Sequence, residues 1–233
     1  MVIFTVYVPS KRRGLNRIPW PMRMKAPKVP TAASAAFGAA FGPRLLPGTY
    51  TVKMTKDKNV YTTQLTVVAD PRAKHTAADR KAQLDLALKL YSLLGDMTFS
   101  VDRINNVRLA LDERAAKLPA DDPLAVRLRA ASAKVDELRK KIVATKEGGA
   151  ITGEERLREN LADLYGNVNG YEGRPSQTQM ERTGAIAREL SDVVKDFDAW
   201  LAKELSGVNS ALSSKQLEPI KVLTREGWEK QDE

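Results

Sequence analysis

Apolar residues recur at spacings of three and four through most of the chain after residue 75. This spacing places them along one face of a helix. We predict four amphipathic helices, which span residues 76–118, 122–147, 152–171 and 176–214. Because short turns separate them, the pattern predicts an antiparallel up-down-up-down four-helix bundle over residues 73–216.

The predicted helix starts carry residues that satisfy free backbone N–H groups. Thr76 and Ser176 are each followed, three residues later, by a side chain that completes a capping box, and Thr152 opens a similar pattern. Asp122 stands before Pro123, which suits the first position of a helix.

A different pattern fills the first 70 residues, where apolar and polar side chains alternate. Residues 49–55 and 60–68 predict a β-hairpin, with the face of Tyr50, Val52 and Met54 buried. Residues 2–8 and 22–24 predict two further strands.

The whole chain is therefore predicted to be of the α+β class, in two parts with a tail. Residues 1–72 form a small β-sandwich-like part of immunoglobulin style, with a long Pro/Ala/Gly loop at 25–43. A loop of that length is expected to be functional or to lie on a partner. The helical part follows, and residues 217–233 are expected to pack back on it.

Charge divides the chain at the same place as the periodicity. Residues 1–74 contain thirteen Lys or Arg and two acidic residues, a net charge of +11, whereas the remainder carries −2. The basic residues are scattered among prolines and strand residues, with one cluster at 11–13, which favours a solvated or partner-facing surface over nucleic-acid binding. An anionic polymer remains an alternative ligand. We predict contacts to a partner by Lys11, Arg12, Arg13, Arg17, Trp20, Arg23, Lys25, Lys28 and Trp228.

The candidate chemistry is sparse, and we predict no catalytic residue, no metal site and no cofactor. The only histidine, His75, stands before a helix start without a nucleophile or carboxylate at a diagnostic spacing. Paired acids at 121–122 and 154–155 lie at helix starts, where negative charge suits the helix dipole. The glycines at 148–149, and Gly166 with Gly170, lack the Lys-Ser/Thr of a phosphate loop. There is no cysteine, and no apolar run is long enough for a membrane span.

An ordered series of segments resembles a known family. It consists of GLNRIPWPMR (14–23), GPRLLPGTYTVK (42–53), LTVVADPR (65–72) and QLDLAL (83–88). The series is similar to the C-terminal region of bacterial secreted proteins with BNR-repeat, sortilin-like β-propellers, which are often labelled glycosyl hydrolases or sialidase-like. The chain contains no Asp-box repeat of the propeller, so no catalytic residue of the family has a counterpart here.

These observations predict a non-catalytic accessory or assembly module that binds a partner protein or a surface polymer. The alternative is the C-terminal part of a BNR-repeat glycoside hydrolase that acts only with an upstream β-propeller. The first residues lack the basic region and the small-residue cleavage site that are typical of a signal peptide. The resemblance implies a periplasmic or extracellular location and a chain that is a C-terminal piece.

Overall fold

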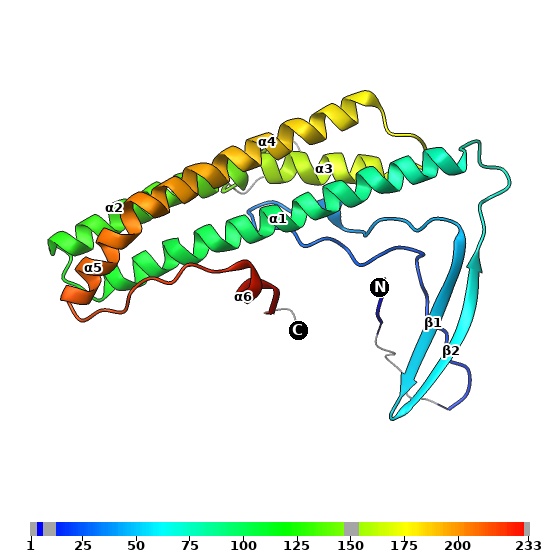
Figure 1. Cartoon of the computed structure of the whole chain (residues 1–233), viewed down its shortest axis with the longest axis horizontal. Coiled ribbons are helices and arrows are strands. Elements are labelled where there is room, and N and C mark those ends of the chain that lie inside the picture. The colour runs from blue at the N-terminus through cyan, green and yellow to red at the C-terminus, as the bar shows by residue number, and fades with distance from the viewer. Residues whose placement is uncertain (1–3, 7–12, 147–153, 231–233) are drawn as a thin grey trace.

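The computed structural model describes residues 4–6, 13–146 and 154–230. Helices dominate the described part (Figure 1). They are α1 (Ala77–Ala116), α2 (Pro123–Ile142), α3 (Leu157–Gly170), α4 (Gln177–Trp200), the π-helical turn η2 (Leu201–Leu205), α5 (Ser206–Ser214) and the short α6 (Arg225–Glu229). The 3-10 turn η1 (Phe37–Ala39) and one hairpin, β1 (Gly48–Lys56) with β2 (Asn59–Val67), precede them.

Three predicted caps form. The Thr76 hydroxyl accepts a hydrogen bond from the backbone of Asp79, and Ser176 caps α4 in the same way. The Asp122 carboxylate accepts from the Leu124 N–H at 2.8 Å, with Pro123 in the first turn of α2. Thr152 lies outside the described residues. The sequence therefore predicted the side chains that cap these three helices.

The helices lie side by side in three rows, which we call lanes, whereas the predicted bundle has four. The Val168 carbonyl of α3 accepts from Gln83, near the start of α1, at 2.7 Å. Asp136 of α2 lies 3.7 Å from Arg108, in the second half of α1. Thus α2 and α3 follow one another along α1, both antiparallel to it, and α4 with α5 forms the third lane (Figure 1). The up-down-up-down bundle is wrong, because two short helices share one side of α1.

The core lies along one face of α1. The predicted stripe follows this face only in part, and it ran through Leu86, Leu90, Leu93, Met97, Val101, Ile104, Arg108, Leu111, Ala115 and Leu118. The apolar residues of α1 that are 1% exposed or less are Ala87, Leu90, Leu94, Met97, Val101, Ile104, Val107 and Leu111. Arg108, which the stripe included, is instead half-buried and pairs with acids on α1 and α2. The stripe was read one position off at that turn.

The β-sandwich and its immunoglobulin-like style are wrong. The described residues contain one antiparallel two-stranded sheet, and it projects away from the helices (Figure 1). Residues 4–6 belong to no strand, the rest of the predicted strand at 2–8 lies largely outside the described residues, and Arg23 makes only an isolated bridge to Arg44. The alternation of apolar and polar residues predicts a hairpin with two unlike faces, but it does not show that a second sheet covers either face.

Residues 25–43, which we call the strap, run across α3. Pro30 and Phe41 accept hydrogen bonds through their carbonyls from Arg158 Nε and the Tyr165 hydroxyl, both at 2.7 Å. Ala33 donates to the Ala144 carbonyl at 3.2 Å. The loop expected to be functional or to lie on a partner thus covers helices of its own chain.

Candidate functional site

The hairpin presents one apolar face, which we define as Tyr50, Val52, Met54, Tyr61 and Leu65. The register pairs Tyr50 with Leu65 and Met54 with Tyr61, so these side chains share one side of the sheet. Val52, Met54, Tyr61 and Leu65 are 41–52% exposed. The opposite face carries mainly threonines and Lys53. The face that the alternation predicted to be buried is therefore open.

One end of the hairpin apolar face is fixed to the N-terminal segment. The Trp20 ring meets the Tyr50 ring edge-on, with centroids 5.8 Å apart. The Tyr50 hydroxyl donates to the Leu46 carbonyl at 2.7 Å. The Trp20 Nε1 donor is buried and has no acceptor within the described part of the chain. Trp20, one of the predicted partner contacts, therefore packs on the hairpin.

The predicted contact residues do not gather into one patch. Lys11 and Arg12 lie outside the described residues. Arg13, Arg17 and Lys25 are exposed on the N-terminal segment. The other four have neighbours within the fold, and of these only Lys28 and Trp228 are brought together, with the Lys28 ammonium 4.0 Å from the centre of the indole.

Arg23 belongs to a polar cluster between the strap and α3. Its guanidinium donates to the Gly42 carbonyl at 3.0 Å and to Asn169 Oδ1 at 3.2 Å. Asn169 Nδ2 in turn donates to the carbonyls of Phe41 and Gly42. Arg23 therefore ties two stretches of its own chain together and is not available as a free anion contact.

Burial sets the protonation of this cluster. Burial raises the pKa of the Tyr165 hydroxyl, so it stays a neutral hydrogen-bond donor. Burial, together with the neighbouring Arg44, lowers the pKa of Arg23. Arg44 in turn pairs with Glu172. The cluster was missed in the sequence, although two polar residues four apart on one helix, Tyr165 and Asn169, could have signalled it.

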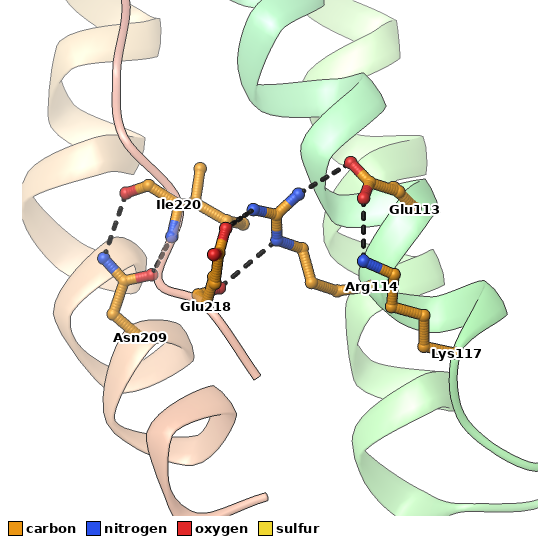
Figure 2. Close-up of polar contacts among 6 residues, drawn as sticks. All are labelled: Glu113, Arg114, Lys117, Asn209, Glu218 and Ile220. Atoms are coloured by element: carbon orange, nitrogen blue, oxygen red, sulfur yellow. Dashed lines mark hydrogen bonds and ion pairs between the residues drawn. The ribbon is translucent and has the colours of Figure 1, made fainter. Parts of the chain in front are cut away.

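The tail is held against α1 and α5 by side chains that bond to its backbone (Figure 2). Asn209 accepts from the Ile220 N–H at 2.7 Å and donates to its carbonyl at 3.2 Å. Arg114 Nε donates to the Glu218 carbonyl at 3.2 Å, and its guanidinium is itself paired with Glu113. Further along, Asn106 accepts from the Leu223 N–H at 3.0 Å. These bonds place α6 beside the middle of α1.

Trp228 of α6 is the buried end of this tail. Its Nε1 donates to Asp102 at 2.8 Å, and its ring meets Phe99 edge-on at 5.7 Å. Lys28 and Arg225 lie over the ring. The residue that we expected to contact a partner therefore anchors the tail inside the fold.

A hollow of about 340 Å³ lies between α1 and α4, with Arg225 of α6 at one wall. We call it the α1–α4 hollow. It is lined by Leu93, Asp96, Phe99, Ser100, Arg103, Ile104, Ala187, Leu190, Ser191, Val194, Phe197 and Arg225. The hollow leaves no signal in the sequence, because it lies between helices that are distant along the chain.

Two of the paired acids, Asp122 and Glu154, hold neighbouring parts of the fold together. Asp122 caps α2 and pairs with Lys215 at 2.8 Å. Glu154 accepts from the Thr145 N–H at 2.9 Å and pairs with Arg156, and these contacts hold the pKa of its carboxyl at about 2. His75 packs against the Tyr171 ring.

Within the described residues, no group of three or more His, Cys, Asp or Glu could hold a metal ion. The helices described there include none that is long and apolar enough to cross a bilayer. No family model, curated protein or solved structure matches this chain. The resemblance to the BNR-repeat proteins therefore stays a prediction.

Proposed function

We propose that this chain is a non-catalytic docking module, and that the hairpin apolar face binds an acidic partner protein. The observation that carries the proposal is the exposure of this face on a hairpin that stands away from the helices. An isolated two-stranded hairpin is at best marginally stable in water, and it gains stability when its apolar face is covered. The helices would serve as the rigid base that presents the hairpin.

The backbone of the hairpin supports the same role. Each strand pairs only with the other in the described structure, so β1 and β2 each have one unpaired edge. Unpaired edges accept an additional strand through main-chain hydrogen bonds, while side chains on one face supply specificity. A partner that adds a strand and covers the apolar face would use both features.

Charge selects the chemistry of that partner. The hairpin, residues 48–67, contains three lysines and one aspartate, a net charge of +2, within a segment of residues 1–74 that carries +11, so two copies of the hairpin would meet with like-charge repulsion. An acidic surface around an apolar patch would instead be attracted. We therefore commit to an acidic protein rather than a second copy of this chain.

Site-specific cross-linking tests the proposal. The chain has no cysteine, so a single cysteine in place of Met54, on the apolar face, can carry a benzophenone. The matched control places the same group at Thr55, on the opposite face. In extracts of the source cell, we expect one adduct from position 54 that is absent from position 55, with an acidic protein as its second component.

Two further measurements decide the outcome. Leu65→Lys, in the Met54→Cys background, should abolish the adduct because it places a charge in the apolar face. The adduct yield should also fall as salt is raised, since exposed charges are screened over about 8–10 Å at 0.10–0.15 M. Equal labelling from both positions, no adduct, or a basic partner would overturn the proposal.

A further inference from the structure

The floor of the α1–α4 hollow is suited to an apolar ligand. Ile104, Leu190 and Phe197 are at most 4% exposed and close its base, and Leu93 and Val194 are half-buried at its sides. Its volume of about 340 Å³ lies at the small end of ligand pockets, which span roughly 300–1,000 Å³. The hollow therefore has room for a small molecule rather than for a helix.

Two arginines stand at the rim of the hollow. Arg103 and Arg225 line it together with one acid, Asp96, and each arginine is paired with an acid of the fold. Arg103 lies over the Phe197 ring at 5.3 Å, and Arg225 lies over Phe99 at 4.8 Å. Stacking on an aromatic ring holds each guanidinium in place beside the apolar floor.

Of the two arginines, Arg103 has more hydrogen-bonding capacity left. It pairs with Asp198 through one nitrogen, at 2.7 Å, and a guanidinium carries five N–H donors. Asp198 is about half exposed, so water competes for it. Arg225 pairs with both Asp96 and Glu229. A ligand anion would therefore be bound mainly by Arg103.

We propose that the α1–α4 hollow binds a small apolar molecule that carries a carboxylate, with the apolar part on Leu190 and Phe197 and the carboxylate on Arg103. This site is separate from the hairpin, and the proposal does not depend on the docking function. The tail takes part, because α6 supplies the Arg225 wall of the hollow.

Octanoate and 1-octanol, added to the full chain, form a matched pair of probes. They share an eight-carbon chain and differ in the carboxylate. In calorimetric titrations we expect octanoate to bind about tenfold or more tightly than octanol, because hydrogen bonds to charged groups contribute about 1.5–3 kcal/mol. In NMR spectra the amide shifts should concentrate at Phe99, Ser100 and Val194.

Two substitutions at one ion pair separate binding from a structural effect. Arg103→Gln removes the cation and should weaken octanoate about tenfold or more while octanol is unchanged. Asp198→Asn removes the competing acid and should tighten octanoate. Both variants break the same ion pair, so a merely structural contribution of that pair would move the affinities in the same direction.

Two more variants complete the test. Arg188→Gln lies on the exposed side of α4, outside the hollow lining, and should change neither affinity. Ser191→Phe, at an exposed position of the lining, should fill the hollow and weaken both probes. Failure of octanoate to bind, equal affinity for octanoate and octanol, or equal octanoate affinity in the Arg103→Gln variant would overturn the proposal.

Discussion

Gly38 and Gly166 mark the closest approach of the strap to the helices. A Cβ atom built on Gly38 would lie 2.2 Å from the Ala162 carbonyl oxygen, and one built on Gly166 would lie 2.7 Å from Gly38 Cα. These neighbours are backbone atoms, which cannot rotate away. We expect Gly38→Ala to lower the free energy of unfolding by about 1–3 kcal/mol, as overpacking does, measured by urea titration.

Gly95 supplies the matched control. It lies within α1, and a Cβ there would meet nothing within 4 Å. Gly95→Ala should therefore raise the free energy of unfolding by about 0.5–1 kcal/mol, because alanine restricts the unfolded chain and favours the helix. If both variants changed stability by the same amount and sign, the close contact of the strap with α3 would be refuted.

Glu154 makes stability depend on pH at the joint between α2 and α3. The Thr145 N–H and the Arg156 guanidinium lower the pKa of its carboxyl from 4.5 to about 2. Because the folded pKa lies below the unfolded one, the carboxylate stabilises the fold above about pH 4.5, and this contribution is lost as pH falls through about 2. Glu154→Gln should lower the urea midpoint at neutral pH, and its difference from the wild type should shrink in acid.

The adjacent Glu155 gives a control for charge alone. It is exposed, and Glu155→Gln removes the same charge one residue away. Its urea midpoint should follow the wild type at each pH. A Glu154→Gln difference that stays constant from about pH 7 to about pH 3 would show that folding does not lower the pKa of Glu154.

At the scale of elements, the tail depends on a few side chains that bond to its backbone. Asn209 makes two such bonds to Ile220 (Figure 2). Asn209→Ala removes both and should weaken tail docking by about 1–2 kcal/mol, at roughly 1 kcal/mol for each bond. The detached population should then rise about 5–30-fold, seen as faster tryptic cleavage after Lys221 and Arg225.

Ser210 separates this effect from a general weakening of α5. Its hydroxyl donates to the Ser206 carbonyl on the exposed side of the same helix, at 3.0 Å. Ser210→Ala should leave the rate of tail cleavage unchanged. If tryptic cleavage of the tail became faster by the same factor in both variants, α5 would fray as a whole, and the hydrogen bonds of Asn209 would not specifically hold the tail.

Local signals in the sequence predicted where helices start, but they did not predict what packs against each element. Thr76, Asp122 and Ser176 cap backbone N–H groups within three residues of themselves, so the short-range pattern was sufficient. The face of Val52 and Met54 was misjudged because alternation separates two faces without saying what covers them. Arg108 was assigned to the core for a related reason, since spacing alone does not reveal an acid on another helix.

At the scale of the whole molecule, the lanes could not be predicted from the stripes. An apolar stripe indicates which residues of a helix are buried, but it does not indicate which other helix covers them. The 40 residues of α1 are long enough for both α2 and α3 to pack along them. The candidate sites share this limit. Trp228 and Lys28 are 200 positions apart, and the α1–α4 hollow joins residues from three helices.

The hairpin and the helices should be separable parts of the molecule. Gly48 and Val67 face each other across the sheet, and paired residues of antiparallel strands have Cα atoms about 4.5–5.5 Å apart. Two glycines can therefore replace residues 48–67. We expect the free energy of unfolding, followed by the helical circular-dichroism signal, to stay within about 0.5 kcal/mol of the wild type, as for changes on exposed surfaces. Excess wild-type chain should compete away the adduct formed at position 54, whereas the shortened chain should not. A loss of several kcal/mol would instead make the hairpin part of the helical core, and competition by the shortened chain would place the partner on the helices.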